Sequence, residues 1–272
     1  MTELTRRKLL AATLATGALA AGGSVLAGTE AAAATPPTAQ GASTRNQTAT
    51  VYVVRHGQTW LNREGLAQGW SDSPLTVSWA PTAQTIGKNL AARDGRLTAA
   101  YSADMVRHFQ TATGILQGAR SSLTVTRDER LREVAFGGFE GSPGTTMWDA
   151  AAGALGHSSM GAALAAGVSI FQLVDAIPSV NPYPADTVAE KSAPVAARML
   201  AALEDIVSSA AHGPNAKILV VSSGLSISCL LSFWGQADRL PPTGLGNGAV
   251  NQLTYSRGSW TVDTVNDLSY TS

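Results

Sequence analysis

The chain has 272 residues, of which 44% are apolar and 14% charged, so it has enough apolar side chains to bury a core and is neither collagen-like nor wholly disordered. Basic and acidic residues both number 19, so no overall charge attracts nucleic acid or an anionic membrane, and a bound anion needs a local group of side chains. The single cysteine, Cys229, excludes an internal disulfide framework and a cysteine-rich metal site, and its apolar neighbours predict a small core side chain.

Segment 1–34 has the three-part build of a secretory signal. A basic cluster at 6–8 precedes a weakly apolar stretch rich in alanine and glycine, and Ala32 and Ala34 form an Ala-x-Ala pattern before Thr35. The paired arginines resemble a twin-arginine signal, which exports folded cargo. A membrane anchor is the weaker interpretation, because glycines dilute the stretch and no charged stop follows it. We therefore expect a secreted protein with no stable anchor after cleavage.

The next segment, 35–48, is rich in proline, threonine, glutamine, alanine and serine and has no apolar periodicity. This composition predicts a flexible linker. We expect a single folded domain over 49–272.

From Ala49 onward, short apolar runs alternate with segments of helical period, the pattern of a layered α/β fold. We expect strands over 51–54, 99–102, 122–126 and 217–221, and a hairpin of 250–255 with 260–265. We expect helices over 81–92, 105–116, 188–211 and 226–234. Thr187 and Glu190 have capping-box spacing at the start of the third helix. These elements predict three layers, with helices on both faces of a mostly parallel sheet.

Segment 141–185 breaks this rhythm. It is rich in alanine and glycine, with scattered aromatic residues, and we interpret it as an inserted helical cap or lid, not a second domain. Its Trp148, Phe171 and Tyr183 would suit a wall over a bulky leaving group, although aromatic residues in a cap more often only pack.

The first expected strand runs directly into Arg55, His56 and Gly57. Open α/β sheets bind ligands at the carboxyl ends of their parallel strands. The guanidinium of Arg55 offers a planar fork for phosphate oxygens. His56 is a candidate nucleophile if a backbone carbonyl holds one ring nitrogen and leaves the other free. Gly57 lets a ligand approach the backbone closely.

The residues around this triplet resemble the histidine phosphatase superfamily, which includes cofactor-dependent phosphoglycerate mutases and many phosphomonoesterases. Blocks in the family's order are RHGQTWLN at 55–62, GWSDSPLT at 69–76, YSADMVRHFQTA at 101–112 and LREVAFGGFEG at 131–141. The resemblance resumes near Lys217. It implies a phosphoglycerate mutase-like fold.

The same resemblance implies a role for each matching residue. His56 would take the phosphoryl group as a phosphohistidine, and Arg55 and Arg107 would hold the phosphate oxygens. Glu133 would protonate the leaving alcohol and then activate water. Neutral donors would line the edge of the pocket: Gln58, Thr59 and Asn62. No metal or other cofactor is implied, and the expected partner is a small phosphorylated or other anionic substrate.

Simpler interpretations stand beside these roles. Arg107 would be an ordinary solvated charge on a helix, and Glu133 would pair on the surface with Arg130 or Arg132. His108 follows Arg107 by one position and so points about 100° away on a helix, which predicts a peripheral residue.

The chain departs from the family at its last block, where a strand leads into Val-Ser-His-Gly. Here Ser223 stands in the place of that histidine. A serine hydroxyl donates one hydrogen bond to an oxyanion but brings no charge and reaches less far. Loss of one such donor costs about 3 to 4 kcal/mol of transition-state stabilisation, or about a hundred- to a thousandfold in rate. Trp79, in place of a family glycine, is a lesser departure that would reshape a turn.

Two functions remain open from the sequence. The first is a secreted phosphomonoesterase that works through a phosphohistidine, with reduced activity. The second is a repurposed relative: a phosphate-binding pseudoenzyme, or an acid/base enzyme that uses Glu133 in the same pocket. The intact nucleophile block favours the first, and Ser223 favours the second.

Overall fold

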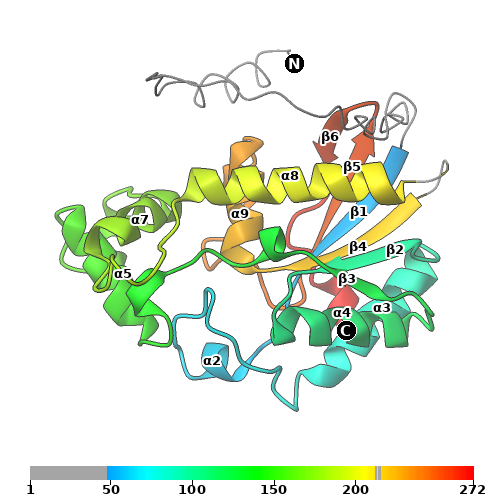
Figure 1. Cartoon of the computed structure of the whole chain (residues 1–272), viewed down its shortest axis with the longest axis horizontal. Helices are drawn as coiled ribbons and strands as arrows, with labels where there is room; N and C mark the ends of the chain where they lie inside the picture. Colours follow the sequence, from blue (N-terminus) through cyan, green and yellow to red (C-terminus); the bar gives the residue numbers. More distant parts are fainter. Residues whose placement is uncertain (1–47, 212, 214–215) are drawn as a thin grey trace, which may run out of the picture. The chain divides into compact units, whose positions relative to one another are not determined.

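A mixed six-stranded sheet forms the centre of the computed structural model, which describes residues 48–211, 213 and 216–272 (Figure 1). The strands, in chain order, are β1 (Thr48–Arg55), β2 (Ala99–Ser102), β3 (Val125–Arg127), β4 (Ala216–Ser222), β5 (Val250–Ser256) and β6 (Ser259–Val262). The spatial order is β3-β2-β4-β1-β5-β6, with parallel pairing from β3 to β1 and antiparallel pairing beyond it. The predicted signal peptide and almost all of the linker lie outside the described residues.

The helices are α2 (Trp60–Arg63), α3 (Ala80–Arg93), α4 (Val106–Gly118), α5 (Gly144–Ala154), α6 (Met160–Ala165), α7 (Ile170–Ala176), α8 (Ser192–Ala210) and α9 (Gly224–Phe233). No helix in the described ranges is long and apolar enough to cross a membrane.

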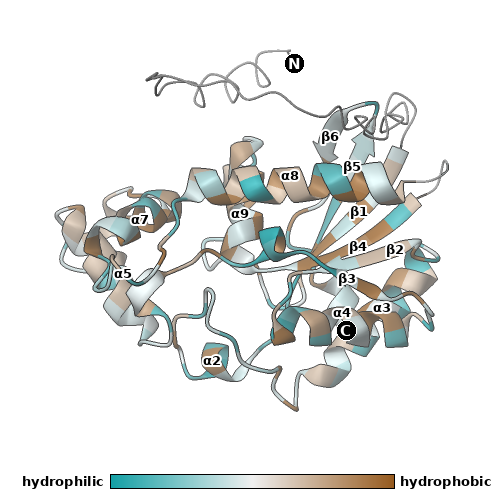
Figure 2. Ribbon diagram, in the orientation of Figure 1, coloured by the Kyte–Doolittle hydropathy of each residue, from teal (hydrophilic) through white to brown (hydrophobic). Residues whose placement is uncertain are grey.

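Two apolar cores lie on opposite faces of the sheet because successive side chains of a strand point to opposite sides. Val51 and Val53 of β1 join a core with α8 and α9, whereas Tyr52 and Val54 join a core with α3 and α4. Much of the length of the central strands is brown in Figure 2, as expected for strands buried on both faces. Helices on both faces of a mostly parallel sheet confirm the predicted α/β fold class.

The expected elements from β1 to the C-terminal hairpin are present, with small shifts at their ends. The third strand is shorter than expected, because only Val125–Arg127 pair with β2. The predicted capping box at Thr187 and Glu190 is wrong. Helix α8 begins after Lys191, while the Glu190 carboxylate pairs with Arg198 instead of capping the helix.

The segment proposed as a cap contains α5, α6 and α7, followed by a 3-10 helix at Ile177–Val180. Its buried Met147, Leu173 and Ile177 belong to the same apolar core as the buried face of α8. Figure 1 shows α5 and α7 grouped at the N-terminal end of α8, to one side of the sheet.

Candidate active site

His56 lies immediately after β1, where the two central parallel strands end together. Arg55 pairs in register with Ser222 of β4, and the backbone N–H of His56 donates to the Ser222 carbonyl at 2.9 Å. The Nδ1 of His56 lies 2.8 Å from the Gly57 carbonyl oxygen. Since a carbonyl only accepts, Nδ1 carries the proton and Nε2 keeps the lone pair. This is the arrangement that the sequence analysis required of a nucleophile.

Burial and two nearby cations keep the His56 ring neutral. The side chain is buried, and burial lowers its pKa well below the usual value, with the charges of Arg107 and Arg55 lowering it further. A neutral imidazole has the free lone pair that nucleophilic attack needs. Both arginines therefore lie close enough to His56 to act on its ring.

Arg107 is fully buried, so its interpretation as a solvated surface charge is wrong. One terminal nitrogen donates to the Ser71 carbonyl and to Asp72 Oδ1, each at 2.9 Å, and the other donates to the Gly69 carbonyl at 2.6 Å. The protein itself thus binds both arms of this guanidinium, and Nε is left for a ligand.

Glu140 shapes the loop that holds Arg107, a role that the sequence analysis missed. Its carboxylate accepts hydrogen bonds from the backbone N–H groups of Gly69, Trp70 and Ser71 at 2.7 to 3.0 Å. These bonds turn the loop carbonyls toward Arg107. The sequence signal for Glu140 was the Glu-Gly pair in the fourth block, a glutamate for which the sequence analysis proposed no role.

Glu133 is buried and pairs with neither Arg130 nor Arg132, so the surface-pair interpretation is wrong. Oε1 accepts from the N–H groups of Val134 and Ser226, and Oε2 accepts from Leu225 N–H at 3.0 Å. The carboxylate therefore caps the N-terminus of α9, where Ser223 makes no side-chain cap. Oε2 keeps one lone pair on which a proton can sit.

Arg198 of α8 fixes the loop that carries Glu133, and this residue too was missed from sequence. Its guanidinium donates to the carbonyls of Arg130, Arg132 and Glu133 at 2.7 to 2.8 Å. The bond to Glu190 holds the guanidinium in place. Nothing in the motif blocks pointed to an arginine so far along the chain.

Thr59 and Asn62 form a reciprocal capping box at the start of α2. The Thr59 hydroxyl also donates to Gln68 Oε1 at 2.5 Å, so its donor is already used within the protein. Gln58 is partly exposed, and its backbone carbonyl accepts from Thr76 N–H. Of the three expected edge donors, Thr59 and Asn62 therefore use their side chains in contacts within the protein.

Trp79 packs against the backbone at the nucleophile. A Cβ added to Gly57 would lie 2.0 Å from two carbon atoms of the Trp79 ring. Glycine at 57 therefore accommodates this indole, and the free backbone approach that we expected to serve a ligand is taken by Trp79. The tryptophan does more than reshape a turn.

His108 is fully buried beside the candidate nucleophile, so its prediction as a peripheral residue is wrong. Its Nε2 lies 2.6 Å from Ser223 Oγ, and its ring meets the His56 ring edge-on with centroids 5.1 Å apart. The 100° argument failed because the first turn of α4 is enclosed on more than one side. The histidine directly after Arg107 was a signal in the sequence that could have drawn attention to this position.

Unpartnered polar atoms gather at this site. Among the described side chains, four buried polar atoms have no hydrogen-bond partner: Arg55 Nε, Arg107 Nε, His108 Nδ1 and Trp260 Nε1. Three of them belong to residues around His56. Buried donors are rarely left unpaired in folded proteins, so each of the two Nε–H groups can still donate to an acceptor that enters the site. A phosphoryl group offers such acceptor oxygens.

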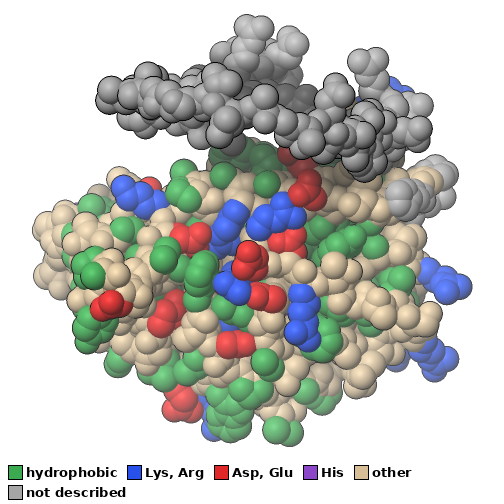
Figure 3. All heavy atoms as spheres, viewed as in Figure 1, with side chains coloured by type: hydrophobic (Ala, Val, Ile, Leu, Met, Phe, Trp, Pro, Cys, Tyr) green, Lys and Arg blue, Asp and Glu red, His purple; other side chains and the backbone are tan. Residues whose placement is uncertain are grey.

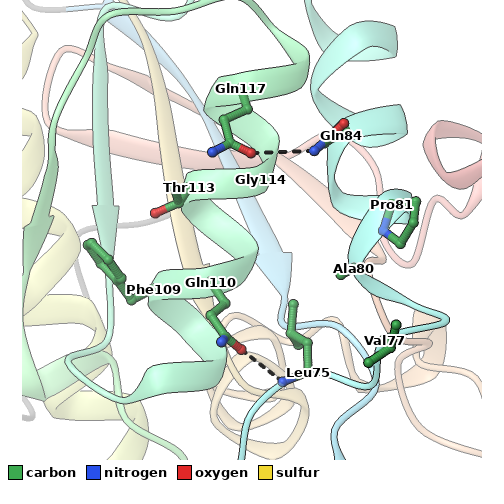
Figure 4. A pocket seen from close by; sticks show the side chains of 10 residues that line it. All are labelled: Leu75, Val77, Ala80, Pro81, Gln84, Phe109, Gln110, Thr113, Gly114 and Gln117. Carbon is green, nitrogen blue, oxygen red and sulfur yellow. Dashed lines mark hydrogen bonds between the residues drawn. The ribbon is translucent and has the colours of Figure 1, made fainter.

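A separate hollow of about 540 Å³ lies between α3 and α4, lined by Leu75, Phe109, Gln110 and neighbouring residues (Figure 4). None of the predicted site residues lines it. Figure 3 shows acidic and basic side chains mixed at the centre of one face and no histidine there, in keeping with the burial of His56 and His108.

Comparison with known proteins places these residues in a family. Residues 51–268 match the model of the histidine phosphatase superfamily (branch 1). The chain is 29% identical over 229 residues to a protein of Proteus mirabilis named probable phosphoglycerate mutase GpmB, covering 81% of this chain and 94% of that one. A shorter match, 40% identical over 94 residues, covers 34% of the bovine fructose-2,6-bisphosphatase TIGAR.

Solved structures agree with this placement. The crystal structure of a phosphoglycerate mutase from Bacillus anthracis superposes with a TM-score of 0.76 at 34% identity, covering 84% of this chain and 97% of that one. A mycobacterial glucosyl-3-phosphoglycerate phosphatase in complex with inorganic phosphate superposes with a TM-score of 0.60 at 25% identity, covering 82% of this chain and 99% of that one.

Proposed function

Because the chain belongs to the histidine phosphatase superfamily, we propose that it is a phosphomonoesterase that works through a phosphohistidine on His56. The observation that carries this proposal is the state of His56: a neutral ring, held at Nδ1 by the Gly57 carbonyl, with two guanidiniums beside it. Nucleophile and charge stabilisation thus lie together at the strand ends.

In the first step, His56 Nε2 attacks phosphorus, the P–N bond forms, and the bond to the leaving oxygen breaks. The Nε–H groups of Arg55 and Arg107 donate to the phosphoryl oxygens, where negative charge is spread in the transition state. A proton carried on Glu133 Oε2 passes to the leaving oxygen. The product alcohol then departs.

In the second step, water attacks the phosphohistidine and gives its proton to Glu133. A P–O bond forms, the P–N bond breaks, and inorganic phosphate leaves. The proton on Glu133 and the free lone pair on His56 are both restored, so the cycle closes without any further reactant.

The proposed substrate is a small phosphate monoester outside the cytoplasm. The twin-arginine-like segment 1–34 supports export, which would separate the protein from the cytosolic substrates of a glycolytic mutase. For this reason we favour the phosphatase activity over the mutase activity named for some relatives.

The test uses the protein from Thr35 onward and an aryl phosphate as substrate. We expect release of phosphate and an acid-labile phosphoprotein, both abolished by His56→Ala. His157→Ala, a histidine in the segment between β3 and α8, is the matched control and should leave both signals unchanged. Folded protein that neither turns over nor becomes phosphorylated would falsify the proposal.

The repurposed relative remains the second candidate, since Ser223 stands where the family has its second histidine. Its prediction differs in one measurement: inorganic phosphate or vanadate would bind at the arginines while turnover stays at the level of His56→Ala. The same set of proteins therefore separates the two functions.

A further inference from the structure

The His108 ring lies against the side chain of Ser223. Ser223 is the first residue after β4, and its short side chain reaches only to Oγ. Just beyond, at 2.6 Å, is Nε2 of an imidazole that comes from α4. A ring built on Cβ of residue 223 in the same direction would collide with this imidazole. The chain thus has an imidazole at this point, delivered by a different element.

The contacts of His108 indicate which ring nitrogen carries the proton. Nδ1 is buried without a partner, and Nε2 faces a hydroxyl oxygen that can accept. Unpaired buried N–H groups are rarer than unpaired acceptors, which favours a proton on Nε2. Burial, together with the charge of Arg107, lowers the pKa of His108, so the ring is neutral with this single N–H.

We infer that His108 and Ser223 together replace the missing histidine: His108 Nε2–H donates to Ser223 Oγ, and the Ser223 hydroxyl donates to the transferring phosphoryl group. Ser223 is then the residue that touches the substrate, and His108 is a positioning residue that acts through it. No proton leaves the pair, because both contacts are hydrogen bonds only. This inference rests on the proposed phosphatase function.

The edge-on contact with His56 supports this arrangement. It holds the two rings 5.1 Å apart and nearly perpendicular, so the His108–Ser223 pair lies beside the candidate nucleophile. A serine nucleophile activated by His108 is the less suitable interpretation. Among the described residues no carboxylate binds His108 Nδ1, so the third member of such a triad is absent there.

The test compares turnover of an aryl phosphate and binding of vanadate across a small set of variants. His108→Phe keeps a flat aromatic ring, though a larger one, and removes the donor, and Ser223→Ala removes the hydroxyl. We expect each to lose about a hundredfold in kcat and to weaken vanadate binding. Since the two residues act as one donor, the double variant should lose no more than either single one.

A relocation variant, His108→Ala with Ser223→His, moves the ring to the family's position. We expect it to regain at least about tenfold over His108→Ala, whereas Ser223→His alone should gain little because the two rings compete for space. His157→Ala again serves as the control. Thermal melting of every variant identifies losses that come from unfolding.

The outcomes separate this inference from the proposed function. Normal turnover in His108→Phe, or additive losses in the double variant, overturns the inference and leaves the phosphatase standing. If the wild type binds vanadate without turnover, the phosphatase fails. The inference about His108 and Ser223 is then tested by vanadate binding alone, and unchanged binding in His108→Phe overturns that inference. A wild type that shows neither signal overturns both.

Discussion

The Arg107 guanidinium and the Asp72 carboxylate form an ion pair at 2.9 Å in which the arginine is fully buried and the aspartate side chain is 24% exposed. The other carboxylate oxygen of Asp72 accepts from the backbone N–H of Val106, the first residue of α4. One carboxylate therefore holds both the phosphate-binding candidate and the start of its helix.

Replacing Asp72 with Asn should weaken both contacts. Removal of one partner from a buried ion pair costs about 3 to 5 kcal/mol. Because Asp72 is partly exposed, we expect a smaller loss of unfolding free energy, of about 2 kcal/mol. Urea denaturation measures it. Asp238→Asn, in an exposed 3-10 helix, is the control. A stability equal to the wild type would contradict this reading of the pair.

Glu133→Gln should separate anchoring from acid catalysis. Glutamine keeps one oxygen for the N–H groups at the start of α9 but carries no proton to a leaving group. With an alkyl phosphate we expect kcat to fall by about 10² to 10⁴. With an aryl phosphate of acidic leaving group the loss should be much smaller, since that oxygen departs without protonation. Equal losses of kcat on both substrates would show that Glu133 has a structural role only and does not act as the general acid.

Stability should fall as the pH drops below about 6.5. The folded-state pKa values of His56 and His108 are both lowered, mainly by burial, so the unfolded chain binds protons that the folded chain does not. Their contribution is therefore full above the unfolded pKa and is lost as pH falls toward the folded values. Each histidine contributes a slope of up to about 1.4 kcal/mol per pH unit.

Urea titrations at a series of pH values between about 8 and 5 test this slope, because this interval contains the ordinary pKa of histidine. His108→Phe should show a shallower dependence than the wild type, because one of the two titrating rings is gone. A flat profile in the wild type would show that these rings take up protons in the folded protein as readily as in the unfolded chain.

Gly57→Ala should destabilise the protein by about 1 to 3 kcal/mol, because the new methyl group meets the Trp79 ring. Trp79→Gly opens that space, so the double variant should be more stable than the sum of the two losses predicts. Differential scanning calorimetry on the four proteins measures the coupling. If the two losses of stability simply add, the Trp79 ring moves away from the new methyl group at no cost.

The strands and helices were readable from sequence where local pattern and burial agree. Strand β2 ends at Ser102, as expected, because helix α4 begins a few residues later, at Val106. Strand β3 was misplaced because an edge strand takes its limits from its partner, here β2, and not from its own composition. Glu190 had the spacing of a capping residue, but Arg198, a distant ion-pair partner, binds it instead.

The site was predictable as far as motif blocks specify residues, and less so where one block contacts another. Arg55, Arg107 and Glu133 are close enough for their charges to interact, and both guanidiniums act on the His56 ring. The contact between His108 and Ser223 joins residues 115 positions apart, and no local pattern contains it. Helical phase alone could not show that both Arg107 and His108 are enclosed.

The pairing of β1 with β4 also limits where the chain can change in length. Arg55 faces Ser222 in register, so His56 and Ser223 leave the sheet at the same level. Insertion of one residue within β4 would send every later side chain of the strand to the opposite core and displace Ser223 from His108. Arg257 and Gly258, in the turn between β5 and β6, are exposed, and there we expect insertions to be harmless.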